Sequence, residues 1–419
     1  MKKPELLSPA GDLKRLKVAL AYGADAVYIG GEFLSLRAKA GNFTKAEMAE
    51  GIALAHSMGK RVFVAVNVSA HNHDFLELDE YLLGLQEINA DALLISDPGI
   101  FMRAKKIVPK MEIHISTQAN ITNFAAVEFW RGMGASRVVL ARELSLQEIS
   151  EISKKSPGIQ LETFVHGAMC MAYSGRCLIS NFLHSRNANR GECSQPCRFS
   201  YTFVEEKTGE AYPATETERG TYIFNSKDLN MIAHIPELIR AGVNSFKIEG
   251  RIKTEYYVGA VTKIYREAID DFFESSDMYE KNIPLYLDEL EKVGNRGYTT
   301  GFFHGKMTGE DHDYSAANQA AAQEFLAIIE NYDKETGFCT IEQRNKFTKG
   351  DAVEILRAGN KNFAQTIETI LDEKGAEINS APHPKQKLKL KINNPVNQFD
   401  IIRKTSQDFC PKISVCDYS

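Results

Sequence analysis

Long apolar stretches are missing from this chain of 419 residues. The longest apolar tract, around Val18 to Gly31, is interrupted by Asp25 and by glycines. It falls far short of the about 20 apolar residues with which a helix crosses a membrane. No apolar stretch follows the two lysines near the N-terminus, so no signal peptide is visible. We therefore expect a cytoplasmic protein without a membrane segment.

A strong charge and a biased composition are missing too. The net charge of −5 excludes a protein that coats nucleic acid with its whole surface, so any RNA-binding surface must be a local patch. The 29 glycines and 13 prolines are too few for a collagen-like or low-complexity chain. Only seven cysteines are present, and in a reducing compartment they favour metal or redox chemistry over a disulfide framework.

The sequence does contain a repeated pattern of apolar run, turn and amphipathic segment over its first 250 residues. Eight runs lack strict alternation, which is typical of strands buried on both faces. They are Glu5–Ser8, Ala26–Ile29, Arg61–Asn67, Ala92–Ser96, Glu112–Ser116, Arg137–Ala141, Gln160–Val165 and Asn244–Glu249. Eight such units predict an α/β fold, a closed (β/α)8 TIM-like barrel. The alternative is an open doubly wound sheet, but no G-x-G-x-x-G fingerprint is present.

The pattern also predicts how the chain is divided. We expect residues 1–275 to form the barrel, with residues 166–243 as a cysteine-bearing insertion. Residues 276–318 form a connecting segment, and residues 406–419 form a tail. In residues 319–405, short alternating runs separated by turn residues predict a small C-terminal antiparallel β-domain. Its predicted strands are Phe325–Asn331, Gly337–Gln343, Ala352–Leu356 and Lys385–Ile392.

Four of the cysteines lie together in the predicted insertion. Cys170, Cys177, Cys193 and Cys197 have the spacing C-x6-C-x15-C-x3-C. Four thiolates suit zinc or an iron–sulfur cluster. Zinc sites usually have two closely spaced cysteine pairs, so the loose first pair favours iron–sulfur, with zinc as the alternative.

Other candidate residues follow the predicted strands, whose C-terminal ends form the active-site face of a barrel. The residues expected to face one pocket include Ser8, Gly30, Asn67, Asp97, Ser116, Gln118, Arg142, His166 and Glu249. His166 is a candidate for proton transfer near neutral pH, or a structural histidine. Lys247 and Glu249 point to the same side of one strand, as catalytic groups or as a buried ion pair.

The predicted β-domain carries a basic strand. Lys385, Lys387, Lys389 and Lys391 alternate with Gln386, Leu388 and Leu390, so the four lysines should share one face. Residues 344–404 contain 12 basic and 7 acidic side chains, against a net negative chain. Such a face could bind RNA phosphates in a salt-dependent manner. Lysines also protect exposed sheet edges from aggregation, and this remains the alternative.

Several longer motifs resemble a known family. The stretch from Glu162-Thr-Phe-Val-His-Gly-Ala-Met-Cys170 to Ser180 is similar to the signature of peptidase family U32, the collagenase-like proteases. Further matches are Pro4-Glu-Leu-Leu-Ser-Pro-Ala-Gly11, Gly23-Ala-Asp-Ala-Val-Tyr28, His114-Ile-Ser-Thr-Gln-Ala-Asn120, Asn225-Ser-Lys-Asp-Leu229 and Lys247-Ile-Glu-Gly-Arg251. The resemblance covers about residues 1–400.

Within the family, the motifs resemble those of the tRNA hydroxylation proteins. The resemblance implies formation of 5-hydroxyuridine at the wobble position without O2, with prephenate as hydroxyl donor. Relatives that hydroxylate a ribosomal RNA cytidine or ubiquinone precursors include some with a four-iron cluster, which implies [4Fe–4S] on the four cysteines. Some ubiquinone-pathway relatives have a cluster cysteine after Lys-Asp-Leu, where this chain has Asn230, so Cys197 is the natural fourth ligand here.

The implied substrates assign further residues. Prephenate carries two carboxylates, which pair well with guanidinium groups, so Arg142 is the first candidate, followed by Arg37, Arg176 and Arg251. The implied macromolecular substrate is the tRNA anticodon loop, whose unpaired bases are easily turned out of their stack. The lysines of the β-domain would then contact tRNA.

Two other functions remain open. The family name implies a peptidase, but neither H-E-x-x-H nor G-x-S-x-G is present, so its nucleophile would be an unfamiliar one such as Ser174 or Cys170. Because related proteins can work in pairs, the chain is alternatively an RNA-binding partner subunit, in a complex with a paralogue or as a homo-oligomer.

Overall fold

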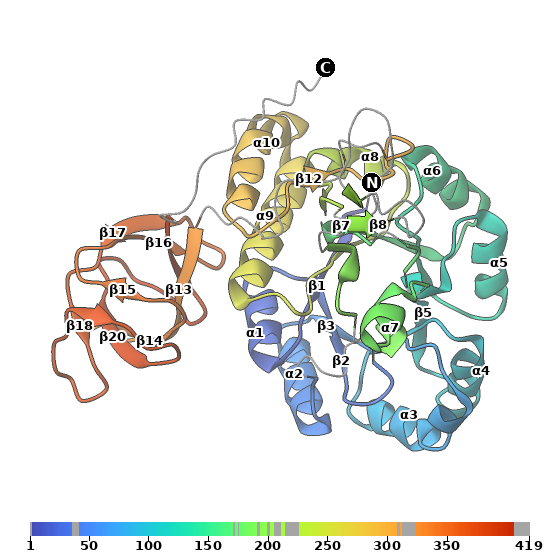
Figure 1. Ribbon diagram of the computed structural model, residues 1–419, viewed down its shortest axis with the longest axis horizontal. Helices are drawn as coiled ribbons and strands as arrows, with labels where there is room; N and C mark the ends of the chain where they lie inside the picture. The colour runs from blue at the N-terminus through green and yellow to red at the C-terminus, as the bar shows by residue number, and fades with distance from the viewer. Residues whose placement is uncertain are drawn as a thin grey trace.

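The computed structural model describes residues 2–35, 42–170, 172–174, 176–190, 193–198, 202–204, 211–213, 226–307, 311 and 323–405. Within them, eight parallel strands form a closed ring (Figure 1). They are β1 (Glu5–Pro9), β2 (Ala26–Gly30), β3 (Arg61–Val66), β4 (Ala92–Ile95), β5 (Glu112–Ile115), β6 (Arg137–Val139), β7 (Gln160–Ala168) and β11 (Ser245–Ile248). Strand β11 pairs with both β1 and β7, which closes the barrel. The predicted barrel is confirmed, and the open sheet is wrong.

Helices alternate with these strands and cover the outside of the barrel (Figure 1). They are α1 (Leu13–Ala21), α2 (Lys45–Ser57), α3 (Leu78–Glu87), α4 (Pro98–Ile107), α5 (Phe124–Gly132), α6 (Leu146–Lys155), α8 (Ile235–Arg240) and α9 (Glu255–Glu274), with short 3-10 turns η1 (Asn72–Phe75), η2 (Thr117–Ala119) and η5 (Ile232–His234). Capping boxes fix the starts of α2, through Thr44 and Glu47, and of α6, through Ser145 and Glu148. Among the described residues, no helix has the length and apolar character to cross a membrane.

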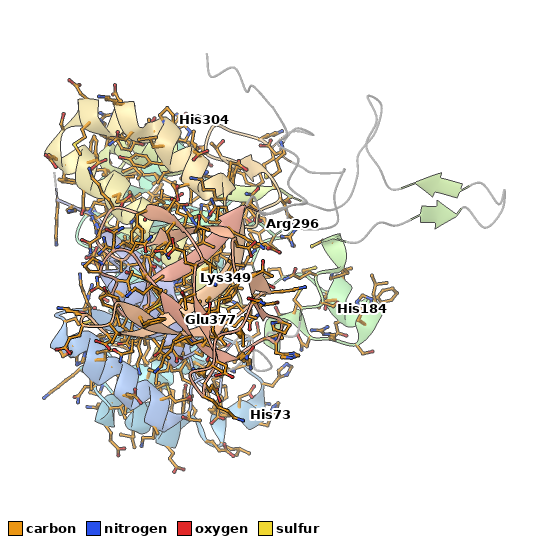
Figure 2. All side chains as sticks on the ribbon, turned by 90° about the vertical axis from the view of Figure 1, so that its left-hand side faces the viewer. His73, His184, Arg296, His304, Lys349 and Glu377 are labelled. Atoms are coloured by element: carbon orange, nitrogen blue, oxygen red, sulfur yellow. The ribbon has the colours of Figure 1, made fainter. Side chains whose placement is uncertain are left out.

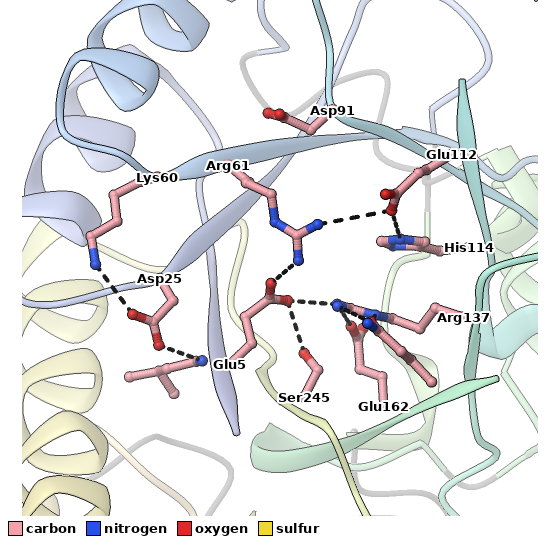
Figure 3. A network of polar contacts seen from close by, with 12 residues as sticks. Glu5, Asp25, Lys60, Arg61, Asp91, Glu112, His114, Arg137, Glu162 and Ser245 are labelled. Carbon is pink, nitrogen blue, oxygen red and sulfur yellow. Dashed lines mark hydrogen bonds and ion pairs between the residues drawn. The ribbon is translucent and has the colours of Figure 1, made fainter. Parts of the chain in front are cut away.

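The inside of the barrel is divided into an apolar layer and an ionic layer. Apolar side chains fill the middle, among them Leu7, Phe63 and Leu94. Below them, at the N-terminal ends of the strands, charged side chains pair with one another (Figure 3). We call this ionic layer, Glu5, Arg61, Glu112, Arg137 and Glu162, the floor of the barrel. The opposite end, where the strands finish, is its mouth.

The chain between β7 and β11 builds an insertion beside the mouth. It contains α7 (Ile179–His184), η3 (Ala188–Arg190), η4 (Pro196–Arg198) and a hairpin of β8 (Thr202–Val204) and β9 (Ala211–Pro213). In Figure 2 the insertion projects from the barrel on the side where His184 is labelled. Strand β10 (Asp228–Asn230) then returns antiparallel to β7, and β12 (Tyr298–Thr299) pairs with β10.

A second sheet follows the barrel. Helix α10 (Ser276–Glu291) packs on α9. The seven antiparallel strands of the sheet run in the order β17-β16-β21-β13-β14-β20-β18. They are β13 (Gln323–Tyr332), β14 (Phe338–Gln343), β16 (Ala352–Leu356), β17 (Phe363–Thr366), β18 (Ile370–Leu371), β20 (Lys387–Lys391) and β21 (Ile401–Thr405), beside a small pair of β15 (Phe347–Thr348) and β19 (Ser380–Ala381).

Buried polar contacts attach this sheet to the barrel. Lys263 on α9 donates from Nζ to the carbonyl oxygens of Arg357 and Asn360, each at 2.7 Å. Arg403 on β21 is completely buried and forms ion pairs of 2.7 Å with Glu289 on α10 and with Glu354. Donors buried in this way are costly to separate from their acceptors, so these contacts fix the sheet against α9 and α10.

Candidate active site at the barrel mouth

A chain of hydrogen bonds lines one side of the mouth. Asn67, after β3, donates from Nδ2 to Ser116 Oγ at 3.2 Å, and Ser116 donates to Gln118 Oε1 at 3.2 Å. Residues predicted at the ends of two different strands, β3 and β5, are therefore brought together. Asn67 Oδ1 is buried and has no hydrogen-bond partner within the described part of the chain. Such an acceptor is costly unless a ligand or water satisfies it, so it is available to a substrate.

The facing side of the mouth carries an acid and a buried arginine. The Tyr28 hydroxyl lies 3.2 Å from Glu249 Oε2, and the Tyr257 hydroxyl donates to the Glu249 carbonyl oxygen at 2.9 Å. Arg251 is buried and donates from Nη1 to Ser35 Oγ at 3.0 Å. Its guanidinium passes so close to Gly30 that any Cβ there would collide with it. The glycine that ends β2 thus makes room for the arginine.

Arg142 joins the mouth to the insertion. Its guanidinium donates to the Ala168 carbonyl oxygen at 2.7 Å and to Ser174 Oγ at 2.9 Å, and it lies 4.9 Å from the centre of the Phe164 ring. Among the described residues, this is the only side-chain hydrogen bond of Ser174. A nucleophilic serine needs a neighbouring base, and no base contacts Ser174 in the described part of the chain.

His166 does not face the mouth, so that expectation is wrong. The register between β7 and β11 shifts so that Lys247 is opposite Phe164 and Ile248 is opposite His166. This one-residue bulge reverses the side on which the following residue points. The imidazole lies at 5.4 to 6.0 Å from the rings of three tyrosines on α9 and β12, which are Tyr257, Tyr265 and Tyr298. Burial, and to a smaller extent Lys253, lowers its pKa to about 3, so it is neutral at physiological pH.

Lys247 has a partner that the sequence did not indicate. Its Nζ lies 2.9 Å from Glu162 Oε1, and Arg137 Nη1 lies 2.9 Å from Glu162 Oε2. The expected pair of Lys247 with Glu249 is therefore wrong, because the nearer carboxylate comes from β7. The Tyr28 ring covers Nζ at 4.5 Å. Burial alone would raise the pKa of Glu162, but the positive charges of Lys247 and Arg137 outweigh it and lower this pKa to about 2.

Hydrogen bonds link α7, which follows Cys177, to the segment that carries Cys193 and Cys197. Ser194 donates from its backbone N–H to Ser180 Oγ at 2.9 Å, which links α7 to the segment from Cys193 to Cys197. The backbone N–H of Gln195 donates to Cys193 Sγ at 3.3 Å. The donors suit a soft metal, but within the described residues no three Cys, His, Asp or Glu side chains are grouped as a metal site. The cluster therefore stays a prediction, and no chemical step is assigned to it.

The remaining arginines differ in their surroundings. Arg37 lies outside the described residues. Arg176 is exposed on the insertion, where its backbone N–H donates to the Tyr173 carbonyl oxygen at 3.0 Å.

The lysines of the second sheet are not equivalent. Lys387, Lys389 and Lys391 share the outer face of β20, while Lys385 precedes the strand with a φ of 63°. Lys387 forms ion pairs with Glu330 and Glu342. Strand β20 pairs with β14 on one side and with β18 on the other, so it is not an edge strand. Protection of an exposed sheet edge against aggregation therefore does not explain its lysines.

Comparisons with known proteins cover almost the whole chain. The family model described as peptidase family U32 matches residues 11–313, and its C-terminal domain model matches residues 321–403. A tRNA hydroxylation protein P1 of Bacillus subtilis is 41% identical over 96% of this chain and 95% of its own length. A tRNA hydroxylation protein P of Escherichia coli is 38% identical over 91% and 92%. A 23S rRNA 5-hydroxycytidine synthase of Escherichia coli is 36% identical over 72% of this chain and 45% of its own length.

Proposed function

Because the chain belongs to peptidase family U32, we propose that it is a tRNA-modifying enzyme that hydroxylates the wobble uridine at carbon 5. The observation that carries the proposal is the match to a tRNA hydroxylation protein along nearly the full length of both chains. A peptidase has less support, because the described neighbours of Ser174 include no base.

The mouth suits a base that has left its stack. Asn67, Ser116 and Gln118 present amide and hydroxyl groups side by side. Enzymes that modify bases read the flipped base through hydrogen bonds to its Watson–Crick edge. We propose that the unused Asn67 Oδ1 accepts a hydrogen bond from the uracil N3–H. Glu249, held by Tyr28 across the mouth, is then the candidate group for accepting a proton.

We propose that prephenate is the hydroxyl donor and that Arg251 holds one of its carboxylates. Arg251 is buried at the mouth, where a carboxylate would be attracted more strongly than in water. Arg142 is the second candidate, although Ala168 and Ser174 already accept hydrogen bonds from two of its nitrogens.

The direct test is product formation. The protein, purified without oxygen, is incubated with unmodified tRNA and prephenate, and digested nucleosides are analysed by mass spectrometry. We expect 5-hydroxyuridine with prephenate and none without it. Absence of the product, while a tRNA hydroxylation relative makes it in parallel, would overturn the proposal. Product that forms only after a second protein is added would instead identify a partner subunit.

The cysteine cluster is tested in the same preparation. We propose that Cys170, Cys177, Cys193 and Cys197 together ligate an iron–sulfur cluster, with about four irons and four sulfides per chain. Cys193→Ser should lose the iron and the visible absorption, whereas Cys339→Ser, in the buried core of the second sheet, should keep both. One zinc and no iron would show a structural site instead.

A further inference from the structure

Helix α7 differs from an ordinary surface helix because its apolar side chains are exposed. Ser180 and His184 lie one turn apart and both contact Ser194, and Ser180 is completely buried. Phe182 lies between them in sequence and so points to the opposite side of the helix. Its side chain is 87% exposed, and that of Leu178, one turn earlier, is 67% exposed. A surface helix normally buries its apolar stripe and exposes its polar one.

The insertion carries further exposed apolar side chains. Tyr173, in the segment that precedes α7, and Leu183, within α7, are each almost half exposed. We call Tyr173, Leu178, Phe182 and Leu183 the α7 patch. Exposed apolar groups that gather in this way usually mark a binding surface. Figure 2 shows α7 projecting on the same side as His73, which follows the C-terminal end of β3, so the patch lies on the mouth side.

The charge around the patch indicates the kind of partner. No Asp or Glu occurs between Glu162 and Glu192, a stretch that contains Arg176, Arg186 and Arg190. Arg176 is exposed directly before α7, and Arg186 follows it. Aromatic rings beside arginines, without acids, are the combination with which proteins bind single-stranded nucleic acid, because bases stack on the rings while phosphates pair with the arginines.

We propose that the α7 patch is a stacking platform for unpaired bases of the RNA substrate, with Phe182 as its main contact. This inference rests on the proposed tRNA activity and adds how the anticodon loop is recognised. The platform holds neighbouring loop bases outside the mouth while the target base enters it. Recognition by stacking is tolerant of sequence, because every base has a flat face.

The test compares Phe182→Ala and Phe182→Trp with wild type, using an unmodified anticodon stem–loop RNA and a fully paired RNA duplex as probes. Phe182→Ala should bind the stem–loop roughly tenfold more weakly, with an unchanged salt dependence and unchanged duplex binding. Phe182→Trp should bind like wild type, and its added fluorescence should be quenched by the stem–loop. Arg186→Gln should weaken binding of both RNAs and reduce the salt dependence.

The matched control is Phe129→Ala. Phe129 is 59% exposed on α5, on the flank of the barrel, and its loss should leave stem–loop binding unchanged. Unchanged stem–loop affinity in Phe182→Ala overturns the inference. So does a change in oligomeric mass without a change in RNA affinity, which would show that the patch joins two copies of the chain. Since binding is measured apart from product, failure of hydroxylation alone counts against the proposed function and not against the platform.

Discussion

The two ends of the barrel differ in how their charged and polar side chains are paired. At the floor, Glu162 is enclosed by Arg137 and Lys247, and Glu5 pairs with Arg61 and Arg137. At the mouth, Asn67 keeps a buried oxygen with no partner in the described part of the chain. Groups that satisfy one another hold the fold together, whereas groups with unused hydrogen-bonding capacity are available to a substrate.

Cavity size alone would point to the floor rather than to the mouth. A cavity of about 600 Å3 lies beside the floor, lined by residues such as Lys3, Lys60 and Arg266. Each of these three cations already pairs with Asp25 or Asp270. The state of the polar groups therefore distinguishes the two ends better than the volume does.

The largest expected effect is on stability, at the floor. Arg137→Ala leaves Glu162 and Glu5 with fewer partners and should lower the free energy of unfolding by about 3–5 kcal/mol, measured by urea denaturation. Lys155→Ala, which removes an exposed pair with Glu151, should cost less than about 1 kcal/mol. Equal losses in the two variants would contradict the structural role of the floor.

Acid should act on two buried groups, His166 outside the barrel interior and Glu162 at the floor, but in different pH ranges. The pKa of His166 is lowered to about 3 in the folded protein, so on acidification the imidazole is protonated in the unfolded chain before it is protonated in the folded one. The free energy of unfolding should therefore fall as the pH drops below about 6.5, by up to about 1.4 kcal/mol per pH unit. Glu162, also with a lowered pKa, makes stability fall only from about pH 4.5 towards 2. Between pH 7 and 5, the free energy of unfolding should depend less on pH in His166→Phe than in wild type. In Glu162→Gln it should depend on pH as it does in wild type. The reverse result would show that the two pKa values are assigned to the wrong groups.

A smaller effect, on activity alone, is expected at the mouth. Arg251→Lys keeps the charge but loses the paired N–H donors, so the KM for prephenate should rise about tenfold while stability changes little. The readout is the initial rate of 5-hydroxyuridine formation against prephenate concentration. Lys105→Ala, at the surface of α4, serves as the control and should leave the KM unchanged. A fall in kcat at constant KM would place Arg251 outside the donor site.

The smallest effect is expected on the second sheet. Lys389→Gln should weaken tRNA binding about threefold and reduce the salt slope by about one, because a single phosphate contact is lost. Lys387→Gln should change affinity less, since Glu330 and Glu342 already neutralise this lysine. Binding measured at two salt concentrations checks both, and a larger effect of Lys387 would reverse the assignment.

The sequence predicted the barrel well because each strand is a separate apolar run. The predicted runs Ala26–Ile29 and Arg61–Asn67 each differ from the observed strand, β2 or β3, by one residue at the C-terminal end. Helix α10 was missed inside the connecting segment, where Pro284 interrupts a polar stretch. The strands β15, β18 and β19 are only two residues long and have no recognisable period.

The candidate site was predicted in part, and the failures have two physical causes. Asn67, Ser116 and Gln118 meet because parallel strands end at the same face. The side of His166 was wrong because alternation assumes no bulge in β7. Lys247 does lie on the same side as Glu249, beside Tyr28, but its partner Glu162 was missed because alternation reveals no pairing between strands. The α7 patch could have been suspected from Phe182 beside His184 in a basic loop, but only the structure shows which side faces out.

The buried contacts of Arg403 and Lys263 also give the molecule a fixed span. Since the second sheet cannot tilt without separating these ions from their partners, the distance from β20 to the barrel mouth is constant. On the proposed function, an RNA that contacts both β20 and the mouth has to match this fixed distance. The fold would then select RNA substrates by their size before any base is recognised.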